Sequence, residues 1–116
     1  MSRNFYSLEI WKRSRELVLE IYRLSELLPA SEKFGLASQL KRASISVPSN
    51  IAEGCGRNHD KELVQFLYIS VGSLCEIETQ LYLLIDLNVI KHQDLEKLID
   101  EVIQIRKMIH GYIKSI

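Results

Sequence analysis

The 116-residue sequence has little chain punctuation, with only two prolines and five glycines. Because these residues mark turns and helix ends, their scarcity favours a few long elements over many short ones. Apolar residues make up 47% and charged residues 26%, an ordinary globular composition that excludes an intrinsically disordered chain. The length suits one domain, so we expect residues 1–116 to form a single unit.

Cysteine is also scarce. Cys55 and Cys75 are too few for a disulfide scaffold and lack metal-ligand spacing, so we expect buried free thiols in a reducing cytosol. The first residues lack the apolar core of a signal peptide, and no stretch approaches the roughly 18 apolar residues of a membrane span. A cytoplasmic protein without a membrane partner is therefore expected.

Neither sign of charge dominates, because 15 basic and 15 acidic residues give a formal net charge of zero. This balance is unlike that of a strongly basic nucleic-acid-binding domain. The charge is uneven along the chain, however. Residues 1–61 carry ten Lys and Arg against seven Asp and Glu (+3), whereas residues 62–116 carry five against eight (−3).

Apolar residues recur every three or four positions in four separate segments, which is the period of amphipathic helices. We predict helices at about 8–28, 31–56, 60–87 and 93–114, with Ser7 and Ser31 as N-terminal caps and Asn88 as a left-handed end. Short connections favour antiparallel neighbours, so the sequence predicts an all-α, up-and-down four-helix bundle. The most regular row is that of the third segment: Leu63, Leu67, Ser70, Leu74, Ile77, Leu81 and Leu84.

Pro48 lies inside the second predicted helix, where it removes a backbone donor and disfavours helix at Val47. The helix either kinks near Pro48 or breaks and restarts. We favour the kink, because the apolar spacing stays in phase across the proline.

The third predicted helix carries a second apolar row beside its main one. Such a wide apolar arc indicates either a helix wedged between two neighbours or a surface that meets another subunit. The candidate oligomer interface on this row is Val64, Tyr68, Val71, Tyr82 and Ile85.

No arrangement typical of an active site is present. No Glu is followed three residues later by His, which excludes the di-iron bundle motif. Glu76 and Glu78 point to different sides of a helix and cannot share a magnesium ion unaided. Nothing places a base beside a serine or cysteine nucleophile. We predict no catalytic residue, metal, cofactor or small-molecule substrate, and hence no enzyme.

One polar cluster on the second predicted helix has two interpretations. Asn50 and Glu53 lie in a mainly apolar element, so they could face inward and need hydrogen-bond partners. Glu53 is also spaced to pair with Arg57. With Gln39, these residues form one candidate: an internal polar network that sets helix register. Alternatively, cations on the first two predicted helices and the following turn could bind phosphates without base specificity. These candidates are Lys12, Arg13, Arg15, Lys41, Arg42, Arg57 and Lys61.

The same region carries a family resemblance. The stretch QLKRASISVPSNIAEGCGR followed by FLYISVGSLCEIETQL resembles the four-helix-bundle proteins encoded in intervening sequences of bacterial 23S ribosomal RNA genes. The opening LEIWKRSRELVLEIYRL and the connection LPASEKFGLASQL are also similar. The resemblance covers nearly the whole chain, and its most specific part runs from Asn50 to Gly54.

The resemblance implies a homo-oligomeric, pentameric ring of up-and-down bundles. Relatives of that family include the accessory protein of diversity-generating retroelements, which resembles a nucleic-acid-binding partner of a reverse transcriptase. We therefore expect a non-enzymatic oligomer that binds RNA or a ribonucleoprotein. The alternative is a protein-interaction scaffold that binds no nucleic acid.

Overall fold

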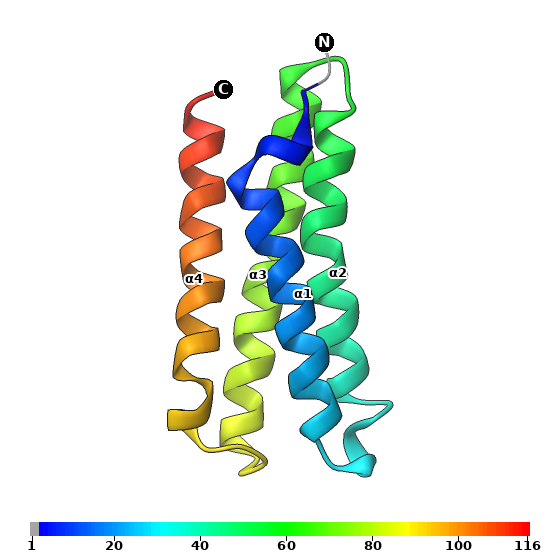
Figure 1. Ribbon diagram of the computed structural model, residues 1–116, viewed down its shortest axis with the longest axis vertical. Helices are drawn as coiled ribbons and strands as arrows, with labels where there is room; N and C mark the ends of the chain where they lie inside the picture. The colour runs from blue at the N-terminus through cyan, green and yellow to red at the C-terminus, as the bar shows by residue number, and fades with distance from the viewer. Residues whose placement is uncertain (1–2) are drawn as a thin grey trace.

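The computed structural model describes residues 3–116, which contain four long helices and no strand. The helices are α1 (Glu9–Leu27), α2 (Leu36–Cys55), α3 (Asp60–Asp86) and α4 (His92–Lys114), as Figure 1 shows. Two short 3-10 turns, η1 (Phe5–Ser7) and η2 (Ala30–Glu32), precede α1 and α2. The predicted all-α class is confirmed. None of the four helices is long and apolar enough to cross a lipid bilayer.

The helices pack side by side as a four-helix bundle of 46 × 23 × 20 Å, and successive helices run in opposite directions in Figure 1. Each helix packs against the next in the chain, and α4 returns to α1. Contact is most extensive between α2 and α3 and least extensive between α1 and α4. The interface between α1 and α4, called the α1–α4 seam below, is therefore the least extensive helix contact of the bundle.

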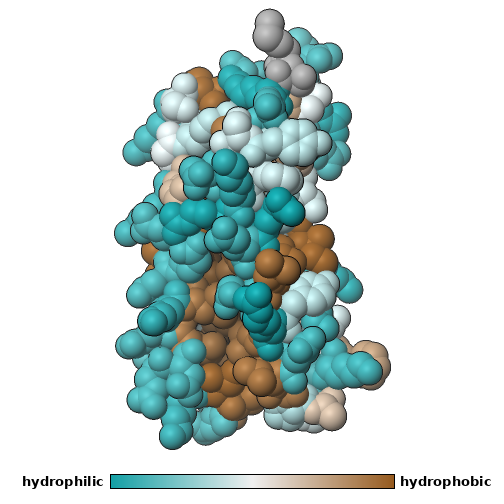
Figure 2. All heavy atoms as spheres, in the orientation of Figure 1, coloured by the Kyte–Doolittle hydropathy of each residue, from teal (hydrophilic) through white to brown (hydrophobic). Residues whose placement is uncertain are grey.

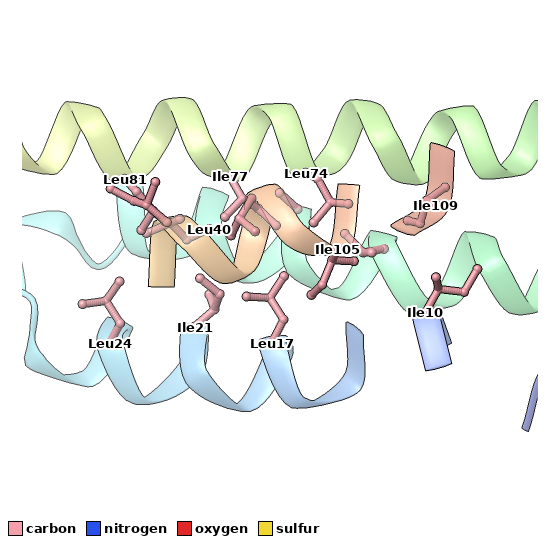
Figure 3. Close-up of a cluster of buried hydrophobic side chains, with 14 of the residues drawn as sticks. Ile10, Leu17, Ile21, Leu24, Leu40, Leu74, Ile77, Leu81, Ile105 and Ile109 are labelled. Carbon is pink, nitrogen blue, oxygen red and sulfur yellow. The ribbon is translucent and has the colours of Figure 1, made fainter. Parts of the chain in front are cut away.

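The core is built from the predicted apolar rows. Leu17, Ile21 and Leu24 of α1 point toward α3 across the centre of the bundle, as Figure 3 shows. All seven residues of the predicted α3 row are buried, including Ser70. Fully burying one Leu or Ile side chain stabilises the fold by about 1.5–3 kcal/mol. The rows thus account for why these segments form helices and why the helices associate.

Ser14 and Ser70 are among the buried serines, and neither leaves its hydroxyl group unpaired. The Ser14 hydroxyl donates to the Ile10 carbonyl one turn earlier in α1. The Ser70 hydroxyl donates to the Val47 carbonyl across the α2–α3 interface, at 2.8 Å. A buried hydroxyl is tolerated when it is hydrogen-bonded, so these polar side chains fit inside the apolar seams.

The structure corrects both predicted serine caps. The hydroxyl of Ser7 donates to the Asn4 carbonyl, and the N-cap of α1 is Leu8, which makes no side-chain capping bond. Ser31 lies in η2, and α2 begins at Leu36 instead of near residue 31. The backbone of Gly35, with φ −107° and ψ −114°, lies outside the helical region and separates η2 from α2.

The helix α2 continues without interruption through Pro48, so the alternative in which it breaks and restarts is wrong. A kink at this position stays a prediction. Proline donates no hydrogen bond, so the Ser44 carbonyl loses its usual helical donor there. Just after the C-terminal end of α3, Asn88 has φ 58°, which confirms the predicted left-handed end of that helix.

Candidate nucleic-acid interface

The structure divides the seven candidate cations into three groups. Lys12 and Arg15 line a groove between α1 and α2, Lys41 of α2 reaches across to α1, and Arg42 is exposed beside Lys41. Arg13 instead faces α4. The remaining two, Arg57 and Lys61, lie in and just after the α2–α3 connection. Only the first group combines several cations with a hollow in the surface.

The groove between α1 and α2, called the α1–α2 groove below, has an apolar floor and a polar rim. Lys12, Arg15 and one acid, Glu16, contribute the charge at the rim. The other lining residues are Tyr6, Trp11, Val18, Leu19, Ile45, Pro48 and Ser49. Leu19 is 56% exposed and Ile45 44% exposed, so part of this apolar surface is open.

Two cations lie over aromatic rings of α1, one pair in this groove and one just beyond its lining residues. The guanidinium carbon of Arg15 is 4.8 Å from the centre of the Trp11 ring, and Nζ of Lys41 is 5.1 Å from the centre of the Tyr22 ring. At the start of α1, Tyr6 stacks on Phe5 with ring centres 4.3 Å apart, and Trp11 meets both rings edge-on. The groove therefore pairs aromatic rings with positive charge.

Arg13 is committed to the α1–α4 seam. Its Nε donates to Glu101 at 3.0 Å, its Nη2 donates to the second carboxylate oxygen, and its Nη1 lies 3.1 Å from the sulfur of Met108. The hydrogen bond with Glu101 is the main cause that raises the pKa of Arg13. With its donors occupied, Arg13 is poorly placed to bind a phosphate, unlike Lys12 or Arg15.

The expected internal polar network consists of two separate sets. Asn50 donates to the carbonyl and the hydroxyl of Ser46, at 2.8 and 2.9 Å, and Ser73 of α3 donates to the same hydroxyl at 2.9 Å. Glu53 is exposed instead of facing inward, and it accepts a hydrogen bond from Arg57 at 3.2 Å. Gln39 is exposed and lies about three helical turns before Asn50. Ser46 and Ser73, which sequence reasoning missed, connect α2 to α3.

Gly54 explains another part of the motif from Asn50 to Gly54. A Cβ atom at this position would lie 2.8 Å from Cβ of Phe66 and 3.2 Å from the carbonyl oxygen of Leu63. The backbones of α2 and α3 approach so closely that no larger residue fits without movement. The glycine is a packing residue of the α2–α3 interface. It does not form part of a phosphate-binding loop.

The candidate oligomer row on α3 divides by exposure. Tyr68 is 52% exposed and Tyr82 41% exposed, whereas Val71 and Ile85 are half-buried against the core. The remaining member, Val64, is also half-buried. Part of the wide apolar arc on α3 therefore packs against the bundle, and the rest is exposed and free to meet another chain.

A second groove lies between α1 and α4, where Figure 2 shows apolar surface in the lower half of the molecule. Its apolar lining residues are Leu24, Leu27, Leu95 and Leu98. Its rim mixes both signs of charge, from Arg23 and Lys97 against Glu20, Asp94 and Glu101. Because the charges oppose one another, this groove is a weaker candidate for a polyanion.

The two cysteines differ in burial, and His92 has an acidic neighbour. Cys55 is buried, and burial raises the pKa of its thiol, whereas Cys75 is exposed, which corrects the expectation of two buried thiols. His92 lies 3.6 Å from Glu96 at the start of α4. Across residues 3–116, no group of three His, Cys, Asp or Glu side chains is placed to hold a metal ion.

The fold and this surface define a class of small four-helix protein with a cationic, aromatic groove between its first two helices. Within that class, the chain belongs to the 23S rRNA-intervening sequence protein family, whose model matches residues 6–111. A crystal structure of a protein of unknown function from the S23 ribosomal protein family of Bacteroides thetaiotaomicron is similar. It has 25% identity and a TM-score of 0.84, covering 90% of this chain and 98% of that one. No curated protein matches significantly.

Proposed function

We propose that this protein is a non-enzymatic, homo-oligomeric accessory protein that binds RNA or a ribonucleoprotein through the cations of α1 and α2. The observation that carries the proposal is that Lys12 and Arg15 line one groove while Lys41, over Tyr22, and the exposed Arg42 lie on the same two helices. Membership of a family described by 23S rRNA intervening sequences supports RNA as the polyanion. A ribosomal RNA partner would place the protein in the cytoplasm.

A chain with no net charge can still bind a polyanion if its positive side chains are concentrated on one surface. Each phosphate contact releases condensed counterions, so binding of this type weakens steeply as salt rises. A homo-oligomer would repeat the four-cation group in every copy, and multivalent contact raises the overall affinity without new contacts. The proposed oligomer, a pentamer by family resemblance, therefore compensates for a weak single patch.

The test is a charge-reversal pair on the proposed surface. The double variant Lys41→Glu with Arg42→Glu should lose at least about ten-fold in affinity for structured ribosomal RNA at low salt. The matched control is Lys97→Glu with Lys107→Glu, which makes the same change in charge at exposed positions of α4. Equal losses in both variants would show non-specific attraction, and no retention by the wild-type protein would refute RNA binding.

A second candidate function is a protein-interaction scaffold. The observation that favours it is the exposed apolar surface of α3, where Ile69 is 50% exposed and Leu83 42% exposed in addition to Tyr68 and Tyr82. Exposed apolar patches of this kind mark protein contacts. A partner polypeptide that co-purifies after nuclease treatment, and that survives the Lys41→Glu and Arg42→Glu changes, would favour the scaffold over RNA binding.

A further inference from the structure

The α1–α2 groove is more than a cluster of positive charge, because Trp11 lies in it and Tyr22 lies one helical turn beyond its lining residue Val18. Trp11 and Tyr22 are 11 residues apart in α1, which is close to three helical turns and about 16 Å at 1.5 Å per residue. Both rings therefore lie along the same side of the helix, and each has a cation over it. Between them the floor is apolar, formed by Val18, Leu19 and Ile45.

We infer that the α1–α2 groove, together with the adjoining Tyr22 and Lys41, binds a single-stranded RNA segment, with bases stacking on the Trp11 and Tyr22 rings and phosphates meeting the neighbouring cations. Alternating aromatic and cationic side chains are the usual means of holding single strands, because every base has a face that can stack. The distance between the rings suits two or three nucleotides of an extended strand. The inference rests on the proposed function and specifies its substrate class.

A single strand suits this surface better than a duplex. In a double helix the base faces are stacked on one another, so rings such as Tyr6, which is 65% exposed, would contact only backbone. An open apolar floor beside cations instead favours an unstacked base with its phosphate at the rim. Each base that stacks on an aromatic side chain contributes several-fold to affinity.

Charge argues for a polyanion over another protein. Lys12 and Arg15 line the groove and Lys41 adjoins it over the Tyr22 ring, whereas Glu16 is its one acidic lining residue. Lys12 also lies 3.8 Å from Glu9, but both side chains are at least half exposed and such a pair is easily exchanged for a phosphate contact. The α1–α4 groove lacks this excess of positive charge.

Trp11 provides a direct readout, because it is the only tryptophan in the chain. The probes are an unstructured RNA of about 12 nucleotides and a duplex of the same length, since single-strand sites span about 4–16 nucleotides. The single strand should quench Trp11 fluorescence to saturation and bind more tightly than the duplex. Quenching uses the unmodified protein, so it does not depend on any variant folding.

The variant Tyr22→Ser should weaken single-strand binding about ten-fold and leave duplex binding nearly unchanged. The matched control is Phe34→Ser, which also removes an exposed ring with a lysine over it, Lys33 at 5.6 Å, but outside the groove. Phe34→Ser should bind both RNAs like the wild-type protein. This selective pattern would support stacking in the groove.

Three results would overturn the inference, and they separate it from the proposed function. RNA binding that depends on Lys41 and Arg42, without Trp11 quenching or any effect of Tyr22→Ser, would remove stacking and retain charge-based binding. No binding of either RNA would remove both. A fall in oligomer mass in Tyr22→Ser, with RNA affinity per subunit unchanged, would identify the groove as a contact between copies of the chain.

Discussion

The guanidinium of Arg13 on α1 binds both carboxylate oxygens of Glu101 on α4, with Nε 3.0 Å from Oε2. The two side chains are 30% and 32% exposed, so the pair is partly shielded from water. It spans the helix interface with the least contact in the bundle. Arg13, proposed from the sequence as a phosphate-binding residue, is thus placed to hold α1 to α4.

Removing this bridge should loosen the α1–α4 seam. Arg13→Gln should lower the free energy of unfolding by about 1 kcal/mol, because two charge-assisted hydrogen bonds are lost at a partly exposed site. Denaturant unfolding followed by circular dichroism measures this loss, and RNA affinity should change little. A large loss of RNA affinity in a fully folded Arg13→Gln protein would contradict the structural role.

In the α2–α3 interface, Gly54→Ala should destabilise the fold by about 1–3 kcal/mol, because the added Cβ would meet Phe66 and the Leu63 carbonyl. The control is Gly72→Ala in α3, where an added Cβ meets nothing within 4 Å. That change should stabilise by about 0.5–1 kcal/mol, since alanine loses less backbone entropy in a helix. Thermal melts of the two variants should move in opposite directions, and equal shifts would refute the close approach.

Alkaline pH should weaken the fold. Burial raises the pKa of the Cys55 thiol and of the Tyr112 phenol above their ordinary values, so the folded state holds these protons more tightly than the unfolded chain. The stabilisation is complete below about pH 9 and declines above it, as the unfolded groups ionise first. Urea unfolding midpoints across this range should fall with rising pH. For the double variant Cys55→Ala with Tyr112→Phe, the urea midpoint should fall less steeply with pH. An identical slope would show that these two groups do not cause the loss of stability.

The oligomer proposal makes a prediction about α3. Tyr68→Glu with Tyr82→Glu should reduce the mass measured by light scattering, because two carboxylates would be buried in an interface between copies. The control, Gln93→Glu with Gln104→Glu, adds the same charge at exposed positions of α4 and should leave the mass unchanged. A wild-type mass of a single chain would refute oligomerisation outright, whatever the variants do.

Much of the fold followed from the sequence because burial there is periodic. The α3 row was predicted completely, and Asn88 ended that helix as expected, since each depends on local geometry and on hiding one face from water. The start of α2 was missed because Gly35 adopts a backbone conformation that no apolar period indicates. Spacing alone gave a set of candidate site residues without their partners, and within that set Lys12 and Arg13 look equivalent in the sequence.

By itself the sequence determined that four segments coil and each bury one stripe, because the hydrophobic effect acts on whichever face repeats every three or four residues. Only the tertiary structure decided which neighbours the polar side chains meet. Lys12 and Arg13 are adjacent in the chain, yet one borders the α1–α2 groove and the other binds Glu101 on α4. Successive helical residues point about 100° apart, so their partners depend on how the helices are arranged around them.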